Sequence, residues 1–116
     1  MTTIPFRGAE IPLQLPRSFA SRYDIVAAGA SEATRHRAIA AALGACWGEA
    51  KTRTWGAYAP PDVSTYGGRV IDALCGQGAK VDEILEAGAV AYNALAATVF
   101  TTAEVDDATV GFPPTE

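Results

Sequence analysis

The residue types that most often carry chemistry are scarce in this chain of 116 residues. Histidine occurs once, at His36, and cysteine twice, at Cys46 and Cys75. His36 stands between arginines and has no carboxylate neighbour, so no Ser-His-Asp or Cys-His arrangement is indicated. One histidine and two cysteines 29 residues apart match no zinc spacing. We therefore expect no enzymatic activity, no bound metal and no cofactor.

Long apolar runs and phosphate-binding motifs are also lacking. The longest apolar run, residues 38–48, is shorter than the about 20 residues that cross a bilayer. The N-terminus has no apolar core of a signal peptide, and two cysteines are too few for the disulfide framework of a small secreted domain. Gly67-Gly68 and Gly76-Gln77-Gly78 follow no predicted strand and lack the lysine of a phosphate loop. These absences predict a cytoplasmic protein without a membrane partner, and we expect both thiols to be buried.

Basic residues are outnumbered and unevenly placed. Nine Lys and Arg stand against 13 Asp and Glu, and the formal net charge is −4. Residues 1–71 hold eight bases and five acids, whereas residues 72–116 hold one base and eight acids. Nucleic acid is disfavoured as a partner because affinity for phosphate comes from clustered Lys and Arg. The polarity either steers docking to another protein or is a solvated charged surface, and the sequence leaves both interpretations open.

Alanine dominates what is present. The chain contains 24 alanines, and hydrophobic residues make up 49% of it. Alanine loses no side-chain entropy in a helix and lets helices approach closely. The length suits one hydrophobic core. We predict a mainly α fold, a small helical bundle of four to five helices with a short N-terminal β-hairpin. The expected single domain has a hairpin arm (1–16), a helical core (17–112) and a tail (113–116).

The N-terminal arm has the pattern of two short strands, residues 3–6 and 11–15. Pro5 and Pro12 remove ladder donors, so the strands are expected at an edge. Because an isolated hairpin is marginal in water, the arm should either pack on the helices or pair with a neighbouring chain. The second alternative makes Ile11 and Leu13 candidate partner-binding residues and allows a homo-oligomer.

Two helices are expected after Pro16. Ser18 is a good N-cap for the first, which is predicted to carry Phe19, Tyr23 and Val26 on one face and to end near Gly29. Ser31 is predicted to cap the second. The residues expected on the apolar face of that second helix are Ile39, Leu43, Cys46 and Trp47.

Residues 61–100 have the pattern of a helical hairpin, with Asp62 or Ser64 opening its first helix. Apolar residues recur at three- and four-residue steps in both halves, and we predict that the two stripes face each other. The stripe residues are Tyr66, Val70, Ile71 and Leu74 in the first half, and Val81, Ile84, Gly88, Tyr92, Leu95 and Val99 in the second. Glycine in a helix costs about 1 kcal/mol relative to alanine. Gly67-Gly68 and Gly88 are therefore expected where another backbone comes close.

The irregular stretch 48–61 carries Trp55 and Tyr58 among basic residues. Two large aromatics in such a loop form either a lid over one end of the core or a recognition patch, since Trp, Tyr and Arg often anchor interfaces. Under the second interpretation, Trp55 and Tyr58 join the candidate partner-binding residues. After this hairpin, residues 101–104 have the spacing of a capping box and predict a short last helix, with Val105 inward and Pro113-Pro114 ending it.

Four short sequences occur in a characteristic order: Ile11-Pro-Leu-Gln-Leu-Pro16, Tyr66-Gly-Gly-Arg-Val-Ile-Asp-Ala-Leu74, Glu83-Ile-Leu-Glu-Ala-Gly88 and a final Gly-Phe-Pro. With its alanine-rich helices, most of the chain resembles the small tail assembly chaperones encoded in tail gene modules of phages and prophages. The resemblance implies a cytoplasmic, non-enzymatic helper that binds the tape measure protein or tail tube subunits and is absent from the finished particle. The alternative is a structural particle component, such as a head-to-tail connector or neck subunit. A small enzyme or ligand-binding domain is disfavoured by the lack of convergent polar groups.

Overall fold

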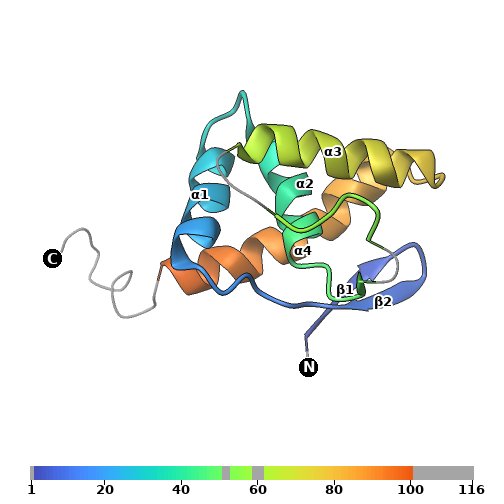
Figure 1. The fold of residues 1–116 in the computed structure, drawn as a ribbon, viewed down its shortest axis with the longest axis horizontal. Coiled ribbons are helices and arrows are strands. Elements are labelled where there is room, and N and C mark those ends of the chain that lie inside the picture. Colours follow the sequence, from blue (N-terminus) through green and yellow to red (C-terminus); the bar gives the residue numbers. More distant parts are fainter. Residues whose placement is uncertain (1, 51–52, 59–61, 101–116) are drawn as a thin grey trace, which may run out of the picture.

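A computed structural model describes residues 2–50, 53–58 and 62–100 of the chain (Figure 1). Strands β1 (Thr3–Phe6) and β2 (Ala9–Pro12) form an N-terminal hairpin. Four helices follow within the described residues: α1 (Phe19–Ala30), α2 (Arg35–Ala45), α3 (Val63–Gly76) and α4 (Val81–Val99). The predicted mainly α fold with a short hairpin is confirmed. The short last helix predicted after residue 100 lies outside the described residues.

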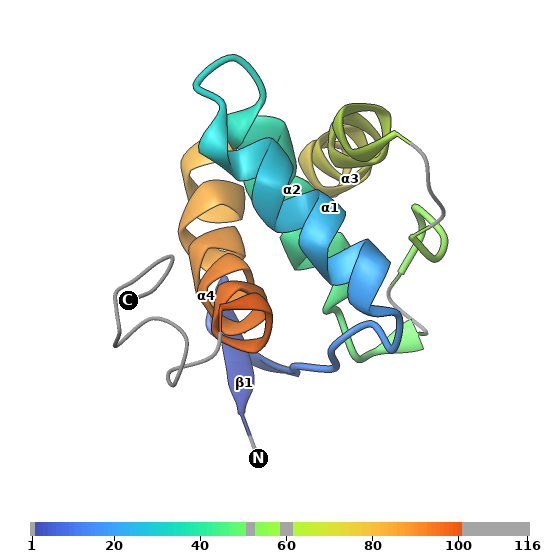
Figure 2. The same ribbon diagram turned by 90° about the vertical axis from the view of Figure 1, so that its left-hand side faces the viewer.

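Helix α2 is the central element, and Figure 2 shows α3 and α4 on opposite sides of it. It is buried on nearly all sides, as expected for a helix whose middle is apolar all round. Small side chains let three neighbouring helices approach this one closely. The buried residues of α2 are Ala38, Ala40, Ala41, Ala42, Leu43 and Gly44.

Two details of the predicted second helix are wrong. It begins at Arg35 instead of next to Ser31, because residues 31–34 form a turn in which the Thr34 N–H donates to the Ser31 carbonyl over 3.2 Å. The predicted single apolar face is also incomplete. Ile39 is only partly buried, while the alanines around it are fully enclosed, since helices cover α2 from several directions.

The stripes of α3 and α4 do not face each other, which corrects the predicted hairpin packing. Each helix packs mainly on α2, which lies between them. A Cβ added at Gly67 of α3 would lie 2.0 Å from the Arg37 carbonyl oxygen, and one at Gly88 of α4 would lie 2.6 Å from the Ile39 carbonyl oxygen. The predicted close backbone approach is therefore confirmed for Gly67 and Gly88, and the partner of both is the backbone of α2. It is wrong for Gly68, where an added Cβ would meet only the Arg37 side chain.

The predicted N-cap of α1 is confirmed, because the Ser18 hydroxyl accepts from the Ser21 N–H over 3.2 Å. The face predicted to carry Phe19, Tyr23 and Val26 together is wrong, since only Val26 is buried. Phe19 and Tyr23 are 53% and 49% exposed. The opposite side, with Ser21, Ile25, Val26 and Gly29, is buried. The small residue on that side admits an aromatic ring from α4, because Tyr92 lies against Gly29 and its hydroxyl donates to the Val26 carbonyl over 2.8 Å.

The hairpin packs on α4, which is the first of the two alternatives for this arm. Its second strand is Ala9–Pro12, earlier than the predicted 11–15, and Leu13 continues it only as an isolated bridge to Trp47. In the observed register Pro5 pairs with Glu10. The Leu13 N–H donates to the Thr2 carbonyl, so residues 2 and 13 form a hydrogen-bonded pair. Because such pairs alternate along an antiparallel ladder, the Pro5 nitrogen points away from β2. Pro5 thus leaves the outer edge of β1 short of one donor for another strand.

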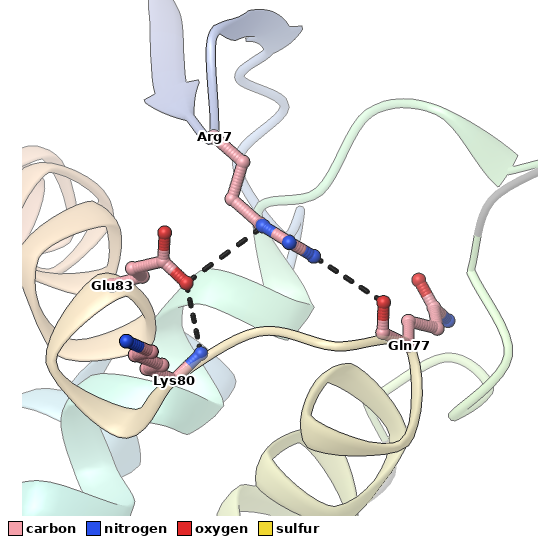
Figure 3. A network of polar contacts seen from close by, with 4 residues as sticks. All are labelled: Arg7, Gln77, Lys80 and Glu83. Carbon is pink, nitrogen blue, oxygen red and sulfur yellow. Dashed lines mark hydrogen bonds and ion pairs between the residues drawn. The ribbon is translucent and has the colours of Figure 1, made fainter.

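An arginine at the hairpin turn joins the arm to the link between α3 and α4 (Figure 3). Arg7 and Gly8 both have positive φ, 51° and 84°, as a two-residue type I′ turn requires. The Arg7 Nε lies 3.7 Å from a carboxylate oxygen of Glu83, and a terminal nitrogen donates to the Gln77 carbonyl over 3.3 Å. The same Glu83 oxygen accepts from the Lys80 N–H over 2.8 Å, which caps α4. The arm is thereby held at the hairpin turn as well as along β1.

Leu95 tests whether the stripe of α4 is a core element. Its side chain is fully buried, and Leu95→Ala should destabilise the protein by about 2 to 5 kcal/mol, because truncation removes apolar contacts and leaves a cavity. Urea denaturation measures the change. Asn93→Ala, at an exposed position of the same helix, is the control and should stay within about 0.5 kcal/mol of the wild type. Equal stabilities for the two variants would remove Leu95 from the core.

Candidate partner-binding surface

The four residues predicted to bind a partner lie in or against the core. Trp55 and Ile11 are buried, and Leu13 and Tyr58 are partly buried and packed on the core cluster. Partner binding by these residues stays a prediction. Their burial leaves Trp55 and Ile11 almost no surface to offer another protein.

Aromatic contacts explain why the loop around Trp55 is folded inward. The Trp55 ring meets the Trp47 ring edge-on at 5.2 Å, and its indole N–H donates to the Gly44 carbonyl over 3.4 Å. A Cβ at Gly44 would lie 2.9 Å from that indole nitrogen, so the glycine makes room for the ring. Trp55 therefore closes one end of α2, which is the arrangement that the lid alternative expects.

A tyrosine pair holds the remainder of this loop. The rings of Tyr58 and Tyr66 meet edge-on at 5.1 Å, and the Tyr66 hydroxyl donates to the Gly56 carbonyl over 3.0 Å. Burial raises the pKa of Tyr66 to about 12, so its hydroxyl stays protonated at neutral pH and remains a donor. The pair ties residues 53–58 to α3.

The apolar surface that does reach solvent lies on α1. Five residues of α1 are exposed, and none of them is charged; we call them the α1 apolar face: Phe19, Ala20, Tyr23, Ala27 and Ala30. The outer side of a surface helix normally carries charged and polar residues. Leu15, just before the helix, is also exposed. An uncharged outer side of this kind indicates a site for another apolar surface.

The aromatic end of the face is held in position by Arg22. The rings of Phe19 and Tyr23 stack with centroids 6.3 Å apart, and the Arg22 guanidinium lies 5.6 Å from the Phe19 centroid. One Arg22 nitrogen donates to the carbonyls of Pro16 and Arg17, over 2.7 and 2.9 Å. The exposed rings therefore start from an ordered arrangement, which lowers the entropy lost on binding.

The spacing of the face suits a helix as ligand. Ala20, Tyr23, Ala27 and Ala30 follow steps of three, four and three residues, the spacing of a helix–helix seam. Three of the four are alanines, so a second helix can approach closely. The 12 residues of α1 give a face about 18 Å long.

Basic side chains border the face. Arg17 is exposed at the beginning of α1, next to Arg22. Arg35 lies past the other end, where its Nε donates to the Gly29 carbonyl over 2.9 Å. Asp24 is the one acid within α1. A ligand with acidic side chains beside an apolar stripe matches these surroundings.

A pocket lies between the hairpin turn and α4, with a volume of about 400 Å³. Its charged lining has both signs, from Arg7, Glu10 and Glu86, and Arg7 is already paired with Glu83. The other lining residues are Pro5, Phe6, Gly8, Ala9 and Val90. This lining contains no Ser, Thr, Cys, His or Lys side chain.

Reactive groups elsewhere are separated from one another. Cys46 is buried, and burial raises the pKa of its thiol to about 12, which disfavours the thiolate. Cys75 is exposed, so the expectation that both thiols are buried is wrong for this residue; it lies on the outer side of α3. In the part of the chain that the structure describes, no three His, Cys, Asp or Glu side chains are placed to hold a metal ion. Among the same residues, no helix is long and apolar enough to span a bilayer.

Sequence reasoning missed the α1 apolar face because α1 has apolar residues on two sides. Phe19 and Tyr23 belong to one side, and Ile25, Ala28 and Gly29 to the other. Apolar spacing alone does not say which of the two sides is buried. The available signal was the small residues Ser21, Ala28 and Gly29 on the other side, which permit close packing, together with the alanine spacing on the aromatic side.

Comparison with known proteins adds no relative: no family model, no curated protein and no solved structure matches this chain.

Proposed function

We propose that this protein is a non-enzymatic binding protein that holds a helical segment of a partner on the α1 apolar face. The observation that carries the proposal is the absence of charge from all five exposed residues of α1. The stacked Phe19 and Tyr23 rings supply the anchors, since a few aromatic residues usually account for most of the binding energy of an interface.

The resemblance to phage tail assembly chaperones suggests which partner this is. We propose that the segment belongs to a tape measure protein or to tail tube subunits, and that the complex forms in the host cytoplasm during tail building. The size of the face supports a transient complex. A helix about 10 Å wide and 18 Å long covers on the order of 200 Å², far below the about 800 Å² per partner of a stable interface. A helper that must release its partner needs such a weak contact.

Partner capture tests the proposal directly. The chain is coexpressed with the tape measure and tail tube proteins of its own gene module, and capture is measured by pull-down. Phe19→Asp combined with Tyr23→Asp should reduce capture by about tenfold or more, because both anchors are lost. Both positions are about half exposed, so the free energy of unfolding should change by no more than about 1 kcal/mol.

Val81→Asp is the matched control. Val81 is 46% exposed at the opposite end of the molecule, on the first turn of α4, and its replacement places a charge on an apolar surface residue without touching α1. This variant should capture the partner at the wild-type level. Wild-type capture by the Phe19 and Tyr23 double variant would contradict the proposed site. Stoichiometric amounts of the protein in mature particles would favour the connector or neck alternative over the chaperone.

A further inference from the structure

We propose that, without a partner, the α1 apolar face binds the chain's own acidic segment, residues 101–116. This inference rests on the proposed function, because the segment occupies the face that the partner needs. The segment competes with the partner for the α1 apolar face, and it restrains binding to that face until the partner is present.

The segment follows α4, a helix that packs on α1. The described residues end at Phe100, whose side chain is 54% exposed. Helix α4 packs on α1, and its C-terminal end lies beside the beginning of α1 in both views (Figures 1 and 2). The hydrogen bond from Tyr92 to the Val26 carbonyl joins these helices near their middle. The described part of the chain therefore ends close to the beginning of α1, the end of the helix that carries Phe19 and Tyr23.

The segment, when extended, is longer than the α1 apolar face. A segment of 16 residues spans up to about 53 Å when extended, at about 3.3 Å per residue. The face is about 18 Å long. The segment is therefore long enough to cover the face. A ligand tethered this closely has an effective concentration in the millimolar range, so a weak contact is sufficient.

The segment is acidic and also carries large apolar side chains. Residues 101–116 contain four acids and no base. The α1 apolar face is bordered by Arg17, Arg22 and Arg35. The segment also contains three large apolar side chains, at Val105, Val110 and Phe112. It thus combines the acidic and apolar groups that match the basic border and the uncharged centre of the face.

A spin label tests the contact in the full chain, without any partner. Cys75→Ser removes the exposed thiol, Cys46 stays unlabelled because it is buried, and Thr109→Cys carries the label. In ¹⁵N-labelled protein the amide signals of Ala20, Tyr23 and Ala27 should lose most of their intensity, whereas those of residues 81–86 should not. About 0.5 M NaCl should restore part of the lost intensity, because salt screens the charge attraction.

Two further variants separate apolar docking from charge alone. Val110→Asp with Phe112→Asp should abolish the broadening on α1. Thr102→Asp with Ala108→Asp adds the same charge but keeps the apolar side chains, and it should preserve the broadening. Loss of signal on another surface, or no loss at all, would overturn the inference.

In the last arm of the test, spin-labelled chain that contains ¹⁴N is mixed with ¹⁵N chain that carries no spin label. Broadening that appears in the mixture would assign the face to the segment of a second copy and overturn the intramolecular contact. None of these measurements contains a tail protein, so their failure leaves partner capture by Phe19 and Tyr23 standing. Absence of partner capture by the wild-type chain, with broadening intact, would reject the proposed function and not the contact.

Discussion

Gly67→Ala is expected to destabilise the protein by at least about 3 kcal/mol, the upper part of the range for overpacked cores. The added Cβ would lie 2.0 Å from the Arg37 carbonyl oxygen and 2.7 Å from its carbonyl carbon. These are backbone atoms of α2, which is packed between α3 and α4. Because α2 cannot shift without disturbing both neighbours, the clash outweighs the about 1 kcal/mol that alanine gains over glycine in a helix.

Two other glycines of α3 are matched controls for this measurement. A Cβ at Gly76 meets no atom within 4 Å, so Gly76→Ala should be neutral or stabilising by up to about 1 kcal/mol. A Cβ at Gly68 meets only the end of the flexible Arg37 side chain, at 2.8 Å, and Gly68→Ala should be tolerated. Urea denaturation of the three variants gives the comparison. A Gly67→Ala variant as stable as Gly76→Ala would show that α3 does not approach α2 this closely.

Trp55→Ala should destabilise the protein by about 3 to 5 kcal/mol, the usual effect of truncating a buried large aromatic. Trp55 is 3% exposed. Its removal leaves the Trp47 ring without its edge-on partner and uncovers Gly44 at the end of α2. The loss is measured by chemical denaturation, with the near-ultraviolet circular dichroism of the tryptophans as a second probe.

Phe19→Ala serves as the control for Trp55→Ala. Both substitutions remove a large aromatic side chain, but Phe19 is 53% exposed, and its loss should change the free energy of unfolding by less than about 1 kcal/mol. The pair also separates the two interpretations of the loop. A Trp55→Ala variant that keeps wild-type stability and loses partner capture would favour the recognition patch. If Trp55→Ala is unstable, while Phe19→Ala is stable and loses partner capture, the results support both the lid and the α1 apolar face.

Local features of the fold were predictable because they depend on neighbours in the chain. The side chain of Ser18 caps α1, and that of Asp62 caps α3 by accepting from the Thr65 N–H over 3.1 Å. Hydrogen bonding from Thr65 also lowers the pKa of Asp62, so the cap is ionised at neutral pH. The type and approximate extent of each described helix likewise followed from apolar spacing and alanine content.

Predictions about which surfaces meet were less successful. Gly67 and Gly88 were correctly expected beside another backbone, because glycine is disfavoured in a helix that gains nothing from close approach. Their shared partner, α2, was not identified. Two amphipathic helices joined by a short link can pack on each other or on a third helix, and spacing along one chain does not distinguish these arrangements.

The candidate binding surface depended on the same kind of decision. The mainly α character, the caps of α1 and α3, the hairpin and the scarcity of reactive groups could all be read from the sequence. The inside position of Trp55 and the outside positions of Phe19 and Tyr23 could not. Burial depends on how all the elements pack together. Tyr92 of α4 occupies the space at Gly29, so the side of α1 that carries Gly29 faces inward and the aromatic side faces outward.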